Sequence, residues 1–152
     1  MFAQRGYLLD TNIVLHATRE RSDFSAAVET QFGLSQSRFR PAICEVTIAE
    51  LKAFAMGWGE ARRQKLLQII TQMIVVQISE PGVHDRWAEL YSHARSKGFA
   101  IHQDLNDVWI GAAAHVSGLT LLSTDRAAFL PLRGTSWIDV VLLDSRTGLV
   151  VP

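Results

Sequence analysis

The sequence predicts an α/β fold in which a mainly parallel, five-stranded sheet lies between two layers of helices. Short apolar runs of strand length alternate with longer segments whose apolar residues recur at helical spacing. Glycine or proline punctuates most of these segments. Hydrophobic residues make up 48% of the 152 residues, which is enough to bury a sheet on both faces. We therefore expect a single domain, residues 1–152, with a three-layer α/β/α arrangement.

Five short apolar runs have the length and composition of buried strands. They are rich in branched aliphatic residues, and polar residues, glycine or proline bound them. Pro41, in the second run, has no backbone N–H to donate, which restricts its place in a sheet. The expected strands are residues 7–9, 39–43, 73–78, 119–123 and 137–143.

Six segments with helical spacing lie between these strands. Ser22 or Asp23 can cap the second segment, because both side chains accept hydrogen bonds from a helix N-terminus. Gly57 and Gly59 separate the third from the fourth, and a glycine ends each of the last two. The expected helices begin near residue 13 and then cover about 22–34, 45–56, 60–71, 82–96 and 104–117.

Charge and cysteine content exclude several classes of protein. Fifteen basic and fifteen acidic side chains cancel, so binding of a polyanion would require a local basic patch. The single cysteine, Cys44, excludes an intrachain disulfide and every multi-cysteine zinc site. No signal peptide pattern and no apolar run of about 18 residues is present. We expect a soluble, cytoplasmic protein that does not enter a membrane.

Acidic residues follow two of the expected strands. Asp10 follows the first strand directly, and Asp125 follows the fourth by one residue. Glu50 and Asp107 lie on expected helices. Ligand sites of open α/β sheets form beyond the carboxyl ends of the strands, so acids distant in sequence can meet there. Clustered carboxylates raise one another's pKa unless a cation compensates them. Oxygen ligands alone suit Mg²⁺ or Mn²⁺ better than zinc.

Four stretches of the chain resemble the PIN-domain ribonucleases, especially the VapC-type toxins of toxin–antitoxin pairs. They occur in the family's order and extend over most of the chain; DTN and EL are weak signals individually, whereas the ordered set is specific. Asp107 matches the aspartate of the family's D-x-x-I-x-A pattern. The stretches are LLDTNIVLHA, VTIAELKAF, NDVWIGAAAHVSGLTLLSTD and RAAF. The residues that the resemblance assigns to both catalysis and metal binding are Asp10, Glu50, Asp107 and Asp125.

The resemblance implies a PIN-like fold and a Mg²⁺- or Mn²⁺-dependent endoribonuclease. In the hypothesis that we derive from it, a metal-activated water attacks an RNA phosphodiester in tRNA or rRNA and leaves a 5′-phosphate and a 3′-hydroxyl. It further implies a homodimer and a VapB-like antitoxin whose tail covers the active-site groove. A PIN-like module that binds RNA or protein without cutting, and a DNA nuclease of related fold, remain alternatives. A receiver domain fits poorly, because Asp10 has no acidic neighbour and no lysine follows Lys97.

Residues beside the strand ends also have structural explanations. Asp10 could cap a helix, and Asp125 could belong to a turn. Thr11 and Asn12 are expected to hold the Asp10 carboxylate in place rather than to act directly. Ser123 is expected to support the site through a hydrogen bond to the Asp125 carboxylate or to a metal-bound water.

The two helix acids have rivals. Glu45 lies at the start of the helix that carries Glu50, where the helix dipole favours a negative charge. Asp104 can cap the helix that carries Asp107, and we retain it as a lesser contributor to the site. Glu50 is expected to border an apolar stripe of Val46, Ala49, Ala53 and Phe54.

Basic residues near these acids are candidates for RNA contacts. Arg126 and Arg133 follow the last acid and could contact phosphate. Trp58 stands between two glycines, so we expect it to be exposed at a connection between helices. It precedes a basic segment that could touch RNA or a partner, although a solvated face is the commoner explanation. That segment contains Arg62, Arg63 and Lys65.

Overall fold

A computed structural model describes residues 6–152 and contains one five-stranded sheet in which all strands are parallel. The strand order is β3-β2-β1-β4-β5, so β1 lies at the centre. The predicted α/β class and five-stranded sheet are confirmed, and the sheet is wholly rather than mainly parallel. The strands are β1 (Tyr7–Leu9), β2 (Ala42–Cys44), β3 (Ile74–Val76), β4 (Thr120–Ser123) and β5 (Val140–Leu142).

Seven α-helices and three short 3₁₀ helices connect and cover the described strands. Ser22 caps the second helix, because its hydroxyl accepts a hydrogen bond from Ser25 N at 3.0 Å. The α-helices are α1 (Thr11–Ala17), α2 (Asp23–Phe32), α3 (Glu45–Ala55), α4 (Glu60–Thr71), α5 (Val83–Lys97), α6 (Leu105–Ser117) and α7 (Arg126–Phe129). The 3₁₀ helices are η1 (Leu34–Gln36), η2 (Ala100–Gln103) and η3 (Leu130–Leu132).

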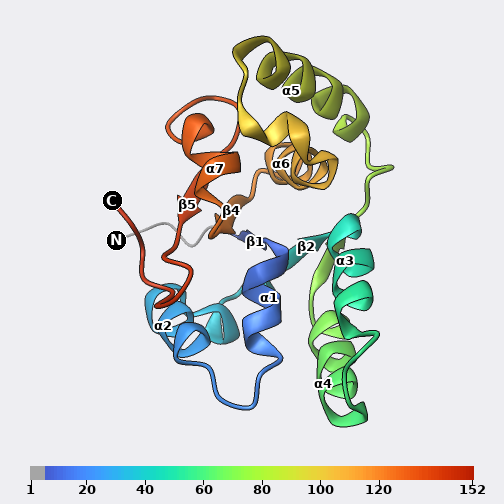
Figure 1. The fold of residues 1–152 in the computed structure, drawn as a ribbon, viewed down its shortest axis with the longest axis vertical. Helices are drawn as coiled ribbons and strands as arrows, with labels where there is room; N and C mark the ends of the chain where they lie inside the picture. Colours follow the sequence, from blue (N-terminus) through green and yellow to red (C-terminus); the bar gives the residue numbers. More distant parts are fainter. Residues whose placement is uncertain (1–5) are drawn as a thin grey trace.

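Successive side chains of each strand point to opposite faces of the sheet, so they contribute to two cores, one on each face. Leu8 and Leu121 contribute to the core beneath α5, α6 and α7. Leu9 and Leu122 contribute to the core that contains residues of α1, α2, α3 and α4. Figure 1 shows α5, α6 and α7 on one side of the strands and α1, α2 and α4 on the other. Burial on both faces explains why the strands are continuously apolar.

Several local predictions were wrong. The third and fifth strands are shorter than the expected residues 73–78 and 137–143, since they cover Ile74–Val76 and Val140–Leu142. The second strand begins at Ala42 rather than at residue 39, since Pro41 cannot donate to a ladder and only its carbonyl accepts, from Ile74 N at 3.0 Å. The buried face of α3 is formed by Thr47, Leu51 and Ala55, whereas Phe54 of the expected stripe is 55% exposed.

Within residues 6–152, no helix is both long and apolar enough to cross a membrane.

Candidate functional site

Asp10 lies where β1 ends and α1 begins, at the centre of the sheet. Its backbone N–H continues the strand pairing by donating to Leu122 O at 3.0 Å. The carboxylate accepts hydrogen bonds from Thr11 N at 2.8 Å and from Ser123 Oγ at 2.6 Å. Only 6% of the residue is exposed, and this burial raises the pKa of the carboxyl from 3.8 to about 6 despite both hydrogen bonds. Asp10 therefore combines helix capping with an unfavourably buried charge.

Ser123 connects Asp10 to Asp125 across neighbouring strands. Its hydroxyl donates to Asp10 and accepts from Asp125 N at 3.0 Å. The Asp125 carboxylate accepts from Ala128 N at 2.9 Å and caps α7. The supporting role expected of Ser123 is thus directed to Asp10, across the sheet, rather than to the neighbouring Asp125 carboxylate. The short α7 was not predicted because a helix of one turn shows no periodicity.

Thr11 connects Asp10 to Glu50 on the other side. Its backbone N–H bonds Asp10, and its hydroxyl donates to Glu50 Oε1 at 2.7 Å. The Thr47 hydroxyl lies 3.3 Å from Thr11 Oγ1 and is fully buried, one helical turn before Glu50. Sequence reasoning did not identify Thr47; its place three residues before Glu50 on the same helix was the available signal. Asn12, by contrast, is exposed.

Asp107 enters the site from the first turn of α6. Asp104 caps this helix. Its carboxylate accepts hydrogen bonds from Asn106 N at 3.0 Å and from Asp107 N at 3.4 Å. Gly111, one turn further, allows α6 to pack closely, because a Cβ there would meet Ile138 Cδ1 at 2.7 Å. A larger residue at this position would require the Ile138 and Leu90 side chains, or the helix that carries Asp107, to shift.

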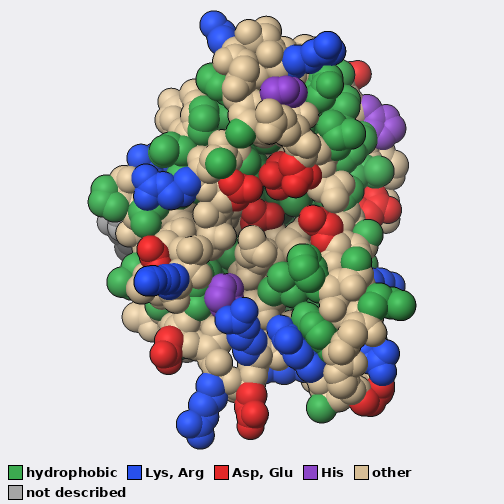
Figure 2. All heavy atoms as spheres, in the orientation of Figure 1, with side chains coloured by type: hydrophobic (Ala, Val, Ile, Leu, Met, Phe, Trp, Pro, Cys, Tyr) green, Lys and Arg blue, Asp and Glu red, His purple; other side chains and the backbone are tan. Residues whose placement is uncertain are grey.

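The predicted acids lie close enough together that the charges of Glu50 and Asp125 raise the pKa of both Asp10 and Asp107. Burial raises the pKa of Asp107 from 3.8 to about 8, with further contributions from the negative charges of Asp10, Asp104, Asp125 and Glu50. Figure 2 shows acidic side chains gathered near the centre of one face of the molecule. We call Asp10, Glu50, Asp107 and Asp125 the acid cluster.

The donor chemistry of the acid cluster suits a hard divalent cation. Its ligand atoms are carboxylate oxygens, and a cation would relieve the repulsion that raises the pKa of Asp107. In residues 6–152, however, no three His, Cys, Asp or Glu side chains approach closely enough to hold a metal ion. Hydrogen bonds within the protein engage both carboxylate oxygens of Asp10 and one oxygen each of Glu50 and Asp125. Assignment of the metal ligands therefore stays a prediction.

Glu45, the rival of Glu50, has a clear structural use. Its side chain is exposed, and Oε2 accepts a hydrogen bond from Ile78 N at 2.8 Å. This bond joins the start of α3 to the segment that leaves β3.

Among the basic candidates, Arg126 is exposed at the start of α7. Arg133 Nη1 lies 3.5 Å from Val151 O, on the C-terminal segment.

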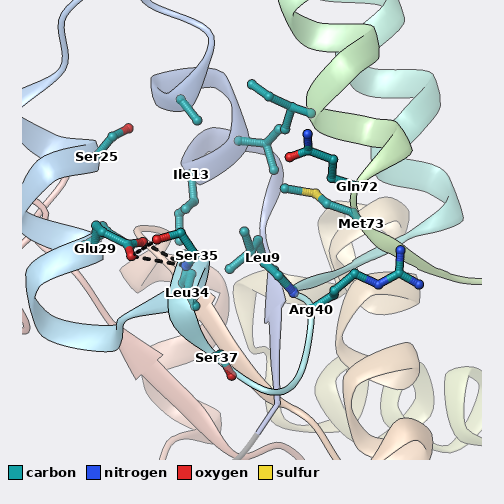
Figure 3. Close-up of a pocket in the computed structure, with 15 residues that line it drawn as sticks. Leu9, Ile13, Ser25, Glu29, Leu34, Ser35, Ser37, Arg40, Gln72 and Met73 are labelled. Atoms are coloured by element: carbon teal, nitrogen blue, oxygen red, sulfur yellow. Dashed lines mark hydrogen bonds between the residues drawn. The ribbon is translucent and has the colours of Figure 1, made fainter.

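A separate apolar cavity of about 470 Å³ lies between α1, α2 and α4. Leu9 lines it from β1, Ile13 from α1, and Met73 from the residues that follow α4 (Figure 3). Glu29 lies at one edge and binds Ser35 through the backbone N–H, at 3.1 Å, and the hydroxyl. No member of the acid cluster lines this cavity, so it is distinct from the candidate site.

Comparison with known proteins agrees with this geometry. The PIN domain profile matches residues 7–130. VapBC2 from Rickettsia felis, solved with a promoter DNA fragment, has a TM-score of 0.73 and 20% identity over 91% of this chain and 99% of that chain.

Two further structures have the same fold. VapBC-1 from nontypeable Haemophilus influenzae has a TM-score of 0.71 and 18% identity over 90% of this chain and 97% of that chain. VapBC-5 from Mycobacterium tuberculosis, of the VapBC family of toxin–antitoxin systems, has a TM-score of 0.64 and 22% identity over 91% of this chain and 99% of that chain. No curated protein matches the sequence significantly.

Proposed function

Because this chain belongs to the PIN-domain family, we propose that it is a Mg²⁺- or Mn²⁺-dependent endoribonuclease. The PIN family is generally a nuclease family. The observation that supports the proposal most strongly is the acid cluster itself: burial, together with the negative charges of four neighbouring carboxylates, raises the pKa of Asp107 to about 8. These four are Asp10, Asp104, Asp125 and Glu50. Folding such charges together without a cation is unfavourable, so their convergence favours a metal-binding role over a purely structural one.

The protein's own residues would bind the cation and position the reaction. Asp10, Glu50, Asp107 and Asp125 would hold the ion, and Ser123 and Thr11 fix the carboxylates of Asp10 and Glu50 through hydrogen bonds. When bound, Mg²⁺ or Mn²⁺ supplies an activated water and neutralises charge on the phosphate. Burial of Asp10 excludes bulk water from the base of the site.

We also propose that the protein is the toxin of a toxin–antitoxin pair and binds a VapB-like antitoxin. The similar structures described above are VapBC proteins, and a further one is a toxin–antitoxin complex from Klebsiella pneumoniae. The apolar cavity between α1, α2 and α4 offers a surface for an apolar segment of such a partner. Backbone hydrogen exchange in these three helices should slow when the cognate antitoxin is added. Unchanged exchange there would reject this cavity as the docking surface. The homodimer implied by the resemblance stays a prediction.

The nuclease proposal is tested by incubating purified, partner-free protein with labelled total tRNA and rRNA in Mg²⁺, Mn²⁺ or EDTA. We expect discrete cuts that disappear in EDTA and in the variants Asp10→Asn and Asp107→Asn. A single-stranded DNA substrate in parallel would identify a DNA nuclease. If folded protein binds RNA but no form cuts it, the alternative of a non-catalytic binding module gains support.

A further inference from the structure

The residues that follow α1 and the start of α4 together carry a group of cations on the same face as the acid cluster. Arg62 Nε donates to Thr18 Oγ1 at 3.2 Å, and Lys65 Nζ donates to Arg19 O at 2.8 Å. Both bonds attach α4 to the residues directly after α1. We call Arg19, Arg62 and Lys65 the basic strip. In Figure 2, Lys and Arg side chains lie below the acidic patch, over the region of α1 and α4 in Figure 1.

Within residues 6–152, the charges of the basic strip are not neutralised by ion pairs. In the part of the chain that the structure describes, the ion pairs are Arg63–Glu60 and Arg86–Glu89. The basic strip instead bonds neutral atoms, a hydroxyl and a carbonyl oxygen, and Arg19 Nη1 lies 3.3 Å from His16 Nδ1. Each arginine has five N–H donors and each lysine three, which exceeds the number of bonds that these contacts use; Arg19 is exposed, and Arg62 and Lys65 are partly exposed.

Trp58 adds an aromatic surface to this group. The Arg62 guanidinium carbon lies 3.6 Å from the centre of the Trp58 ring, a cation–π arrangement that holds the guanidinium flat. Trp58 is therefore half-buried beneath Arg62 rather than exposed, as the flanking glycines suggested. Basic side chains combined with aromatic and guanidinium planes are typical of surfaces that bind single-stranded nucleic acid.

The position of the basic strip relative to the acids is set by α1. This helix begins beside Asp10 and has seven residues, so its end lies about 10 Å from the acid cluster at 1.5 Å per residue. An RNA strand that runs along α1, with its reacting phosphate at the acid cluster, would place the following phosphates beside the basic strip. The attraction there offsets the repulsion that the acids exert on a polyanion.

From these contacts we propose that the basic strip binds the backbone of single-stranded RNA a few nucleotides from the cleavage position. This inference rests on the proposed ribonuclease function. RNA fits better than an acidic peptide because Lys and Arg side chains lie on the same face as the acidic patch and because the basic strip includes an arginine stacked on an aromatic ring.

The test measures binding of a short, unpaired, fluorescein-labelled RNA by anisotropy in EDTA, so that it does not depend on cleavage. The variant Arg62→Gln/Lys65→Gln should bind about tenfold more weakly, and the slope of log affinity against log salt should decrease by about 0.7 for each lost phosphate contact. Arg63→Gln is the matched control, since Arg63 lies on the same helix but pairs with Glu60, and its affinity should stay within about twofold of the wild type. Thermal melting checks that each variant is folded.

Cleavage kinetics separate this inference from the proposed function. If the wild type cuts RNA, Arg62→Gln/Lys65→Gln should raise KM with kcat nearly unchanged, because the lost contact is equal in ground and transition states. If the folded double variant has the same RNA affinity, salt slope and KM as the wild type, the proposed role of the basic strip is overturned. The proposed nuclease activity is unaffected by that result. Weaker binding of a labelled poly-glutamate peptide with unchanged RNA binding would also overturn it and assign the surface to an acidic protein segment. Absence of both RNA binding and cutting by the wild type would reject both proposals.

Discussion

Two halves of the same sheet edge use acidic residues in different ways. Beyond β1 and β4, Asp10 is 6% exposed, its pKa is raised to about 6, and it shares Ser123 with Asp125. Beyond β2 and β3, Glu45 is exposed and accepts one hydrogen bond from Ile78 N. Both acids follow a strand at the carboxyl edge, yet only Asp10 belongs to a group of mutually repelling, partly desolvated carboxylates.

The difference shows that the environment of an acid at a strand end, more than its position, indicates its role. Glu45 contributes a local connection between α3 and the exit of β3, which water can largely replace. The charges of the acid cluster are held together by covalent topology and by hydroxyl groups, at a cost in folding stability. Variants at these positions should therefore differ in both activity and stability.

The largest expected effect is on catalysis at the acid cluster. Asp107→Asn should reduce RNA cleavage by about 10³-fold, because loss of a metal-binding carboxylate removes several kcal/mol of transition-state stabilisation. Glu45→Gln, its matched control at the other half of the edge, should stay within about threefold of the wild type. Initial rates under Mn²⁺ saturation measure both variants. Equal losses of cleavage rate in Asp107→Asn and Glu45→Gln would show that the two halves of the sheet edge do not differ in function.

A smaller loss of activity is expected at Ser123. Ser123→Ala removes the hydroxyl that donates to Asp10 and accepts from Asp125 N. Groups that orient metal-binding side chains typically contribute about 10–100-fold to activity or metal affinity. We expect a loss in that range, with Mn²⁺ affinity reduced in parallel. Full activity with unchanged Mn²⁺ affinity would show that Asp10 is positioned by its other contacts alone.

Metal-free stability should depend on pH through Asp107. Its folded pKa of about 8 lies above the ordinary value of 3.8, so the folded protein retains this proton while the unfolded chain has already lost it. Stability from this group is therefore present below about pH 4 and lost as the pH rises toward 8. In EDTA, Asp107→Asn should melt a few degrees higher than the wild type near pH 8, an effect that solvent screening limits.

The same melting experiment supplies its own control. Near pH 3, below the ordinary pKa of 3.8, the Asp107 carboxyl is protonated in both the folded and the unfolded wild type, so the advantage of Asp107→Asn over the wild type should vanish or reverse. A melting temperature difference between the two proteins that does not change with pH would show that Asp107 is not desolvated in solution.

The smallest expected effect is on the stability of the fold at Glu45, in the half of the sheet edge beyond β2 and β3. Glu45→Gln replaces the charged acceptor of the Ile78 N–H with a neutral one. The bond is solvent-exposed, so the free energy of unfolding should fall by about 1 kcal/mol or less. Urea denaturation measures this change. A loss of several kcal/mol would mean that Glu45 is far more important to the fold than its exposure indicates.

The elements that sequence predicted well are those with a long pattern or a strong terminal signal. Helix α5 has enough turns to show its period, and Ser22 caps α2 as expected. The one-turn helix α7 has no such pattern, and the buried face of α3 depends on how that helix meets the sheet. Tertiary packing, which one sequence does not display, determined these features.

The acids of the candidate site could be proposed from sequence, but their connections could not. Asp10 and Asp125 were identifiable because parallel strands bring their carboxyl ends to one edge. The Ser123 bond to Asp10 spans 113 residues, and the Thr11 bond to Glu50 spans 39. Neither follows from local spacing, since the strand order β1–β4 and the approach of α3 to α1 create both.

The central claim, that these acids form one divalent-cation site, is tested most directly by titrating metal-free protein with Mn²⁺ in a calorimeter. We predict that the wild type and Glu45→Gln bind Mn²⁺ with similar affinity. Asp10→Asn and Asp107→Asn should each bind at least about tenfold more weakly. Equal affinity in all four proteins, or no binding by the folded wild type, would contradict the claim.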